Sequence, residues 1–297
     1  MTRIAFLGLG HMGLPMAVNL MRAGHDVRGF DLVPAALDAA AQAGIVIADS
    51  GADAASAADV VITMFPAGRH VIDAYEGGLL AAAPPGTLFI ESSTIAVDEA
   101  QVAHELALRA GHRSVDAPVS GGVVGAENGT LAFMVGGSAE DFAAALPVLE
   151  IMGARIVHCG GPGLGQAAKV CNNMILAVSQ IAVAEAFVLG ERLGLEHQAL
   201  FDVVSQASGQ CWSVTTNCPV PGPVPTSPAN REYRPGFAGA LMAKDLGLAL
   251  QAIEQTATDA RMGRLAQEIY ALFAAGDGAR RDFSGIITEI RDASSRR

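Results

Sequence analysis

The stretch Gly8-Leu9-Gly10-His11-Met12-Gly13 follows a short apolar run, Arg3–Gly8, and leads directly into a helical pattern at Leu14–Ala23. A G-x-G-x-x-G sequence between a strand and a helix is typical of a dinucleotide-binding βαβ unit. In that setting the first glycine permits a tight turn, the second lets a pyrophosphate approach the backbone, and the third allows the helix to pack closely on the strand. The stretch therefore predicts a Rossmann-type sheet at the start of the chain.

Beyond this stretch, short apolar runs alternate with alanine-rich helical patterns through the first half of the chain. The central runs lack polar alternation, as expected of strands that are covered on both faces. We expect strands at Arg3–Gly8, Asp26–Asp31, Val60–Phe65, Thr87–Ser92, Arg113–Val119, Leu131–Gly136 and Arg155–Gly160. Helices are expected between them at Leu14–Ala23, Pro34–Ala43, Val97–Ala110 and Ala139–Met152. Repeated strand–helix–strand units predict an α/β domain with a doubly wound, mainly parallel sheet.

The pattern changes at the glycine-dense segment Gly160–Gly165, and a length of 297 residues itself favours two domains. Gln166–Leu195 then indicates one long helix, and no convincing strand follows it. Ser213–Gly236 holds six of the 14 prolines and is expected to be irregular. Further helical patterns lie at Gln198–Ser208, Gly239–Gln255, Met262–Ala275 and Asp282–Ala293. We predict a Rossmann-type domain at 1–161 and an all-α domain at 162–297 that begins with the long helix.

Composition argues against several kinds of partner. The net charge is −11, and no cluster of basic residues exists beyond Arg280–Arg281 and Arg296–Arg297, whereas a nucleic-acid-binding protein needs a basic patch. The seven histidines and four cysteines lack the spacing of metal ligands, and there is no Cys-x-x-Cys pair. We therefore expect no nucleic-acid partner, no metal and no disulfide framework.

The N-terminal run leads directly into the first predicted strand, so we expect no targeting segment. The longest apolar run, Met174–Gly190, is interrupted by Ser179, Gln180 and Glu185 and is expected to fall short of a membrane span. A cytoplasmic protein without a membrane partner is predicted. Because this run offers more apolar surface than one small helical domain covers, we also expect a homodimer through the second domain, or a homotetramer built from two dimers.

Asp31 stands at the end of the second predicted strand, 18 residues after Gly13. A carboxylate in that place would hold the ribose hydroxyls of an adenosine. Its charge would repel the 2′-phosphate of NADP, and Leu32-Val33-Pro34 supplies no replacement cation, although Arg28 lies nearby. The predicted cofactor is therefore NAD.

A second glycine cluster, Asp116–Gly122, follows the fifth predicted strand at the edge where open α/β sheets bind ligands. Ser120, Gly121 and Gly122 could present backbone amides to a carboxylate as an anion nest. A tight strand-to-loop turn explains the same residues equally well. A serine-hydrolase elbow is excluded because Pro118 stands where that motif requires glycine.

Polar residues interrupt the start of the long helix. Lys169 and Asn173 are four residues apart and share one helix face. If Lys169 is buried near the helix N-terminus, burial and the helix dipole both lower the pKa of its amine, so that it can accept a proton from an alcohol. The alternative is a solvated polar helix end. The pair Lys244-Asp245 has a similar alternative, an exposed helical charge pair.

In this order and spacing the four clusters resemble the β-hydroxyacid dehydrogenase family over essentially the whole chain. Gly8–Gly13 is similar to the family's cofactor loop and Asp116–Gly122 to its substrate loop. Gly165–Asn173 is similar to its G-x-x-x-K-x-x-N-N catalytic segment, and Met242–Leu246 to a late motif on the cofactor side. The proline-rich segment before that motif resembles the members that act on 3-hydroxyisobutyrate.

The resemblance implies a role for each matching residue. Lys169 would be the catalytic lysine. The residues implied to bind substrate are Ser120, Gly121, Gly122, Asn173, Lys244 and Asp245. Those implied to bind the cofactor are Gly8, Gly10, His11, Met12, Gly13, Asp31, Phe65, Pro66, His70, Thr94, Phe237 and Lys244. His70 and Phe65 depart from the Asn and Leu that are frequent at these positions in the family.

The implied activity is NAD-dependent oxidation of 3-hydroxyisobutyrate to methylmalonate semialdehyde, a step of valine breakdown. One alternative keeps the fold and changes the substrate, giving a tartronate- or succinate-semialdehyde reductase. Another is a noncatalytic NAD-binding module used for protein interaction. The intact pair of Lys169 and Asn173 argues against the module, since such relatives typically lose the lysine.

Overall fold

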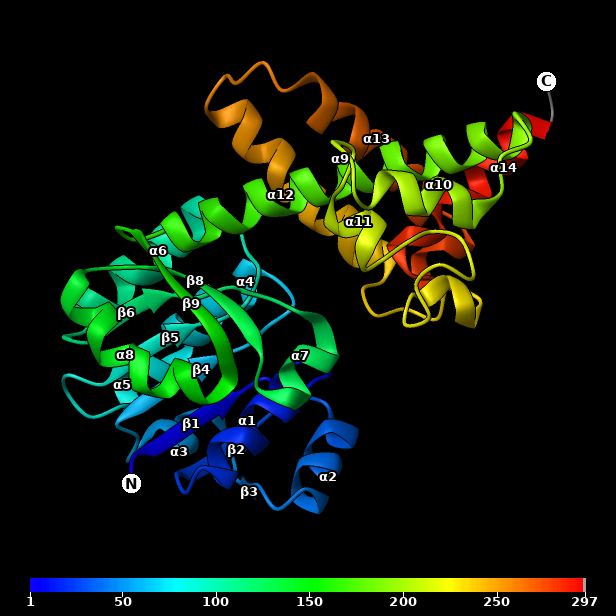
Figure 1. Cartoon of the computed structure of the whole chain (residues 1–297). Coiled ribbons are helices and arrows are strands. Elements are labelled where there is room, and N and C mark those ends of the chain that lie inside the picture. Colours follow the sequence, from blue (N-terminus) through cyan, green and yellow to red (C-terminus); the bar gives the residue numbers. More distant parts are fainter. Residues whose placement is uncertain (296–297) are drawn as a thin grey trace. The chain divides into compact units, whose positions relative to one another are not determined.

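The computed structural model describes residues 1–295 and divides the chain into two compact units (Figure 1). Unit 1 is Met1–Lys169, and unit 2 begins at Val170. The division falls inside the long helix α9 (Leu164–Arg192), whereas the sequence placed the domain boundary at residue 161. The α/β class of the first part and the all-helical class of the second confirm the predicted fold.

Unit 1 is built on a nine-stranded sheet with the order β3-β2-β1-β4-β5-β6-β8-β7, in which β9 also pairs with β8. The pairing is parallel except where β8 meets β6 and β7. The strands are β1 (Arg3–Leu7), β2 (Asp26–Phe30), β3 (Val46–Ile47), β4 (Val60–Thr63), β5 (Leu88–Glu91), β6 (Arg113–Asp116), β7 (Val119–Ser120), β8 (Leu131–Gly136) and β9 (Gly153–Gly160). This is the doubly wound, mainly parallel sheet that the sequence predicts.

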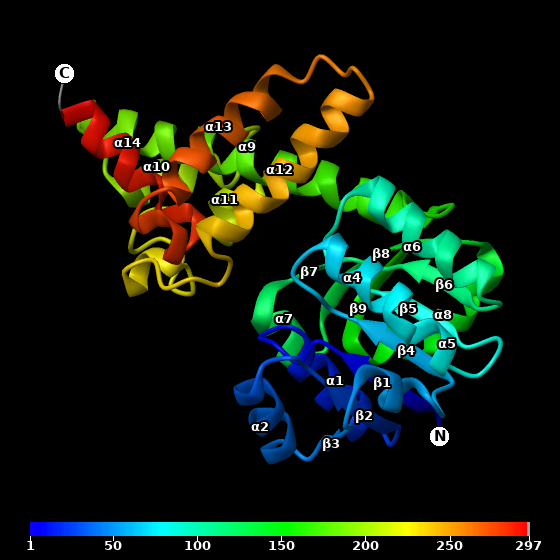
Figure 2. The same ribbon diagram turned by 180° about the vertical axis from the view of Figure 1, so that it is seen from behind.

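Helices cover both faces of this sheet (Figure 2). On β1, Ile4 and Phe6 point into one core and Ala5 and Leu7 into the other, as the strand's period of two requires. The first core is covered by α1 (Gly13–Arg22), α2 (Pro34–Gln42), α7 (Gly122–Asn128) and α8 (Ala139–Met152). The second is covered by α3 (Gly51–Ala55), α4 (Gly68–Ala74), a π-helical turn (Tyr75–Leu79), α5 (Leu80–Ala82) and α6 (Val97–Arg109).

Two expected elements differ from the structure. The predicted strand Arg113–Val119 is two strands, β6 and β7, because Pro118 between them has no N–H to donate to a ladder. The predicted helix Asp282–Ala293 begins later, with a 3₁₀ turn at Phe283–Gly285 followed by α14 (Ile286–Ser295). Asp282 lies outside the helix because its carboxylate accepts a hydrogen bond from the backbone N–H of Ser284, as a capping residue does.

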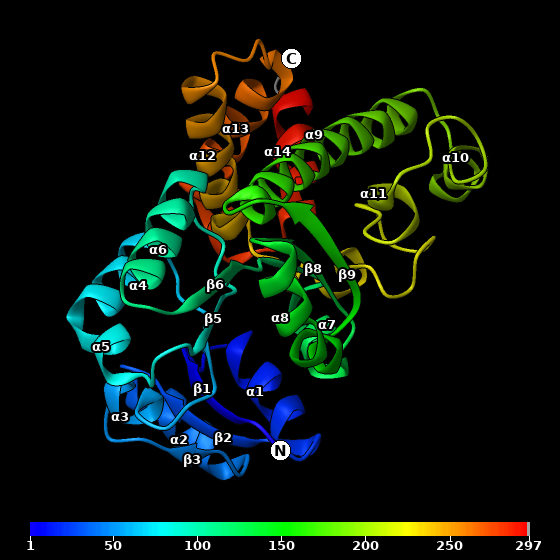
Figure 3. The same ribbon diagram turned by 90° about the vertical axis from the view of Figure 1, so that its left-hand side faces the viewer.

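Unit 2 consists of helices and irregular segments around one core, to which Phe187, Tyr270, Phe273 and Phe283 contribute the large side chains. Helices α12 and α13 pack side by side (Figure 3). The helices after α9 are α10 (His197–Val204), α11 (Trp212–Thr215), α12 (Gly239–Gln255), α13 (Arg261–Ala274) and α14, with 3₁₀ turns at Pro228–Arg231 and Asp277–Arg280. In the described part of this unit, the only β pairing is an isolated bridge between Ala238 and Asp282.

The proline-rich segment of unit 2 is irregular, as predicted, yet it belongs to the core. Val220, Val224 and Tyr233 are buried. The hydroxyl of Tyr233 donates a hydrogen bond to the carbonyl oxygen of Pro219 at 2.8 Å. The segment is therefore held by its own apolar side chains and is a structural part of unit 2.

Helix α9 is long and apolar enough to cross a membrane by length and composition alone. The prediction that the apolar run falls short of a membrane span was therefore wrong as far as length and composition go. Half of its most apolar window is buried within the structure. One such helix is weak evidence for a membrane span, because a buried core helix passes the same test.

An ion-pair cluster joins the end of α9 to α14 and α10. The guanidinium of Arg291 donates to both carboxylate oxygens of Glu191, at 2.5 Å and 3.1 Å, and His197 Nε2 lies 2.7 Å from the same carboxylate. The hydrogen bonds from Arg291 are the main reason that the pKa of Glu191 lies below its ordinary value of 4.5. Because the pKa is lower in the folded state, the stabilisation is complete above the unfolded value and is lost as the pH falls through the folded value.

We predict that Glu191→Gln lowers the free energy of unfolding at neutral pH by about 1–2 kcal/mol, since it removes a charge-assisted, partly buried pair. The difference from the wild type should shrink as the pH falls below 4.5. Urea unfolding followed by circular dichroism across this pH range measures both effects. Glu105→Gln is the control, because its pair with Arg109 is about two-thirds exposed and contributes little. A deficit that stays constant with pH would contradict the prediction.

Candidate functional site

The loops that follow the strands of unit 1 meet at the carboxyl edge of its sheet. Backbone hydrogen bonds join the first residue of each loop to the last residue of a neighbouring strand. These bonds are Gly8 N–H to Phe30 O, Met64 N–H to Leu7 O, Ser92 N–H to Thr63 O and Ala117 N–H to Glu91 O. The predicted cofactor and substrate loops are therefore neighbours along a single edge, which is where open α/β sheets bind ligands.

The glycine loop has the close approaches that its motif predicts. Gly8 has a φ of +95°, and a Cβ there would lie 2.2 Å from the carbonyl oxygen of Met64. A Cβ on Gly13 would lie 1.9 Å from the carbonyl oxygen of Gly8. A Cβ on Gly10, in contrast, would meet no heavy atom within 4 Å and would instead fill the open side of the loop. The loop thus fits a pyrophosphate that approaches the backbone at Gly10, ahead of the N-terminus of α1.

Asp31 is fixed at the end of β2. Its carboxylate accepts hydrogen bonds from the backbone N–H of Leu9 at 2.7 Å and of Val33 at 2.8 Å. These bonds hold one carboxylate next to the glycine loop, which suits the ribose of an adenosine. Arg28 is engaged elsewhere, because its guanidinium donates to the carboxylate of Asp53 at 2.8 Å.

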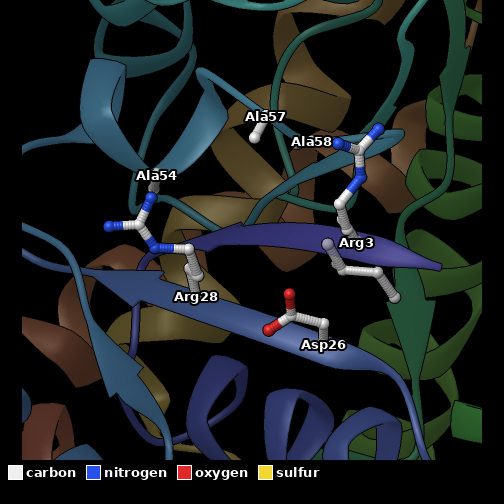
Figure 4. Close-up of a pocket in the computed structure, with 7 residues that line it drawn as sticks. Arg3, Asp26, Arg28, Ala54, Ala57 and Ala58 are labelled. Carbon is white, nitrogen blue, oxygen red and sulfur yellow. The ribbon is translucent and has the colours of Figure 1, made fainter. Parts of the chain in front are cut away.

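Figure 4 shows Arg28 at a small pocket lined also by Arg3, Asp26, Ala54 of α3, and Ala57 and Ala58 after it. Arg3 and Asp26 begin β1 and β2, so this pocket lies toward the amino ends of the strands, away from the glycine loop. The salt bridge between Arg28 and Asp53 joins β2 to the first turn of α3. The guanidinium of Arg28, which the sequence left as a potential partner of a 2′-phosphate, is therefore paired with Asp53.

Other predicted cofactor residues lie on neighbouring loops of the same edge. Phe65 is half-buried after β4, and its backbone N–H donates to the hydroxyl of Ser93 at 2.7 Å. Thr94 follows β5, and His70 lies on α4. His11 and Pro66 are exposed and Met12 is half-buried. Their roles toward a cofactor stay predictions.

The predicted substrate loop forms a turn between β7 and α7. Ser120 ends β7, and Gly121 and Gly122 follow with φ values of +130° and +62°. Such values strain any residue with a side chain, so the tight turn that the sequence allowed is present. The backbone amides of this turn are the groups that an anion nest requires, and substrate binding there stays a prediction.

Lys169 is the sixth residue of α9 and is only 6% exposed, while Asn173, one turn later, is 1% exposed. A solvated polar helix end, the alternative left open by the sequence, is therefore wrong for these two residues. Burial of an amine needs polar partners and favours its uncharged form. The structure thus supplies the burial that the proposed proton acceptor requires.

In unit 2, Asp245 holds two of the predicted residues. Asn173 Nδ2 donates to one carboxylate oxygen at 2.5 Å, and Lys244 Nζ lies 3.6 Å from the other. Asp245 is buried, so the exposed charge pair considered for Lys244-Asp245 is not what the structure contains. Phe237, before α12, is half-buried and its ring packs edge-on against Phe283. Asp245 therefore orients Asn173 and Lys244.

Three buried polar residues of unit 1 make contacts that the sequence did not predict. Gln166 and Glu91 were not singled out, and Asp116 was assigned only to the substrate loop. Asp116 accepts hydrogen bonds from two backbone N–H groups at the start of α9, and burial raises the pKa of its carboxyl. A polar residue that ends an apolar strand was the signal that could have revealed Glu91 and Asp116, whereas Gln166 lies on α9 and has no such signal.

Comparison with known proteins agrees with this geometry. Residues 3–161 match the family model described as the NAD binding domain of 6-phosphogluconate dehydrogenase. Residues 163–290 match the model described as NAD-binding of NADP-dependent 3-hydroxyisobutyrate dehydrogenase. Together the two models span nearly the whole chain.

Relatives that match over nearly the whole of both chains are also similar in sequence. A probable 3-hydroxyisobutyrate dehydrogenase of Mycobacterium tuberculosis is 58% identical over 98% of each chain. An NAD-dependent L-serine dehydrogenase of Pseudomonas aeruginosa is 49% identical over 96% of each chain. The solved structure of M. tuberculosis 3-hydroxyisobutyrate dehydrogenase with L-serine superposes with a TM-score of 0.95, covering 98% of this chain and 99% of that one.

The fold, the glycine loop and these matches define a dehydrogenase that uses NAD(P), and the chain belongs to the β-hydroxyacid dehydrogenase family. Within that family its similarity is to the 3-hydroxyisobutyrate dehydrogenases. The family and the nicotinamide dinucleotide cofactor that the sequence predicted are thereby confirmed.

The two glycines of the cofactor loop should respond differently to a methyl group. Gly10→Ala is predicted to keep the melting temperature and to weaken NAD+ binding at least about tenfold, because its Cβ meets no protein atom but occupies the cradle. Gly13→Ala is predicted to cost about 1–3 kcal/mol of stability through overpacking. Thermal unfolding and fluorescence titration with NADH measure the two effects. Gly77→Ala, at an exposed site with no neighbour within 4 Å, is the control. Wild-type affinity in Gly10→Ala would place the cofactor elsewhere.

Proposed function

We propose that this protein oxidises 3-hydroxyisobutyrate to methylmalonate semialdehyde with NAD+ as the oxidant, in the breakdown of valine. The observation that carries the proposal is the burial of Lys169. The helix start before this residue is hydrogen-bonded to the loop after β5, and that loop lies at the same edge of the sheet as the glycine loop. The similarity to relatives named for this activity supports it.

In the proposed reaction, the amine of Lys169 accepts the proton of the substrate hydroxyl, and the carbon that bears the hydroxyl becomes a carbonyl carbon. A bound nicotinamide ring supplies the acceptor for the hydride that leaves that carbon. The backbone amides of Gly121 and Gly122 hold the substrate carboxylate. The resemblance assigns Asn173, whose amide group is oriented by Asp245, to substrate binding. The contribution of the protein is positioning and removal of the proton.

Asp31 supports NAD over NADP. Its carboxylate keeps its place through two backbone hydrogen bonds, so a 2′-phosphate there would meet a fixed negative charge. The pairing of Arg28 with Asp53 leaves that guanidinium engaged. Both features favour two free ribose hydroxyls.

L-Serine is a second candidate substrate, because one relative is named an L-serine dehydrogenase and a similar solved structure contains L-serine. Like 3-hydroxyisobutyrate, L-serine has a primary hydroxyl on C3, where the carboxyl carbon is C1. The same carboxylate site and the same lysine would serve both. A tartronate- or succinate-semialdehyde reductase would have the same fold but would reduce an aldehyde to the alcohol. A noncatalytic module gives no reason to bury Lys169.

Initial rates of NADH formation with 3-hydroxyisobutyrate, L-serine, glycerate and 4-hydroxybutyrate test the proposal directly. We predict the highest kcat/KM for 3-hydroxyisobutyrate, and at least about tenfold preference for NAD+ over NADP+ because of the charge of Asp31. Asp31→Asn should narrow that preference while leaving the order of substrates unchanged. A higher kcat/KM for L-serine would change the substrate and keep the mechanism, whereas NAD+ binding without turnover of any of the four would refute the catalytic role.

Lys169→Met, which keeps the length of the side chain and removes its amine, should lower kcat by about 10²–10⁴-fold. Binding of NAD+ should change little, because Lys169 acts on the substrate hydroxyl. Steady-state kinetics and isothermal titration with NAD+ separate these quantities, and circular dichroism checks the fold. Equal losses of cofactor affinity and turnover would show that Lys169 is needed for structure instead of proton transfer.

A further inference from the structure

A buried polar network lies under the first turn of α9. Asp116, at the end of β6, accepts a hydrogen bond from the backbone N–H of Gly163 at 2.7 Å and another from that of Gln166 at 2.9 Å. Both donors are among the N–H groups at a helix start that have no partner within the helix. A side chain from another strand therefore caps the helix that carries Lys169.

Two glycines make room for this cap. A Cβ on Gly136 would lie 2.3 Å from one carboxylate oxygen of Asp116. A Cβ on Gly165 would lie 2.7 Å from the other and 2.4 Å from the carbonyl oxygen of Met134. The helix start is thus packed directly on β6 and β8, and a side chain at either glycine would force it away.

The side chain of Gln166 extends the network in the other direction, and it is fully buried. Its Oε1 accepts a hydrogen bond from the backbone N–H of Ile95 at 3.2 Å. Its Nε2 donates to the carbonyl oxygen of Ser93 at 2.7 Å and to Glu91 Oε2 at 3.2 Å. Gln166 therefore joins α9 to the loop that follows β5.

This network reaches the loop predicted to line the cofactor. Glu91 Oε1 accepts a hydrogen bond from the backbone N–H of Ser93 at 2.7 Å. The hydroxyl of Ser93 in turn accepts one from the backbone N–H of Phe65, also at 2.7 Å. A continuous series of hydrogen bonds thus runs from Phe65, after β4, to Gln166 on α9.

Lys169 follows Gln166 by three residues, about one helical turn. A displacement of the first turn of α9 therefore displaces the amine as well. Hydrogen bonds in a buried, low-dielectric setting are strong and hold such a turn rigidly. Reaction rates are sensitive to this, since an error of about 1 Å in placing a reacting group can cost about 10²-fold.

We propose that Gln166, held by Asp116 and Glu91, is a positioning residue that sets the place of the Lys169 amine relative to the cofactor loop. The inference rests on the proposed function, in which Lys169 accepts the proton. Gln166 itself touches no reacting atom in this scheme. Glu91 and Asp116 are buried carboxylates with no step of their own in the reaction, and in this proposal their role is to hold Gln166.

The test compares Gln166→Leu with Gln180→Leu. Gln180 lies on the same helix and is also fully buried, but neither its Oε1 nor its Nε2 has a hydrogen-bond partner. We expect Gln166→Leu to lower kcat about 10- to 100-fold, with KM and NAD+ affinity within about threefold of the wild type. The deuterium isotope effect from the carbinol carbon should rise as the chemical step becomes slower. Gln180→Leu should leave kcat and the isotope effect unchanged.

A rescue separates positioning from general damage. Gln166→Glu alone places two carboxylates together and should lose activity. Adding Glu91→Gln restores a donor between the two side chains but not the hydrogen bond to the carbonyl oxygen of Ser93. We therefore expect a partial recovery, at least about fivefold in kcat over Gln166→Glu. If Gln166→Leu does not fold, this pair of variants still tests whether Gln166 positions Lys169.

Hydrogen exchange of the segment 164–169 supplies a reading that needs no substrate, and faster exchange in Gln166→Leu than in Gln180→Leu is expected. Wild-type exchange in that segment, or wild-type kcat in a folded Gln166→Leu enzyme, would overturn the proposal. A wild-type enzyme that turns over no β-hydroxyacid would instead overturn the proposed function, and the exchange result would still show whether Gln166 holds the Lys169 segment.

Discussion

The docking of the first turn of α9 on the sheet is the constraint on which the candidate site depends. A helix start has backbone N–H groups without partners, and here Asp116 satisfies two of them from the end of β6. Gln166 adds side-chain bonds to the loop after β5. Lys169 is therefore placed by the sheet itself, because the elements that hold its helix also carry the loops of the carboxyl edge.

The same constraint explains where glycine is needed. Gly8 and Gly13 let β1, its loop and α1 approach within distances that a Cβ forbids, and Gly136 and Gly165 do this for the start of α9. Gly10 differs, because a Cβ there would meet no heavy atom within 4 Å. Four of these glycines serve packing inside the protein, whereas Gly10 suits the approach of a ligand.

Much of this arrangement could be predicted from the sequence. Continuous apolar runs marked the strands, and a glycine cluster or an acid at a strand's end marked the functional edge, because the carboxyl ends of parallel strands meet there. The short helices α3 and α5 are too brief to show a helical period. The bonds of Gln166 to Ile95 and Glu91 join residues 71 and 75 positions apart, and such pairings leave no periodic trace in a single sequence.

Burial of charged groups supports the proposal that the start of α9 serves a reaction. Lys169, Asp116, Glu91 and Asp245 are each 6% exposed or less. Moving a charged group out of water costs several kcal/mol even after relaxation, and burial raises the pKa of Asp116 despite its two backbone donors. Well-packed apolar residues would stabilise the fold at least as well. The proposed function explains this burial at the start of α9, because the amine of Lys169 would have to be partly desolvated and held in place to accept a proton from an alcohol.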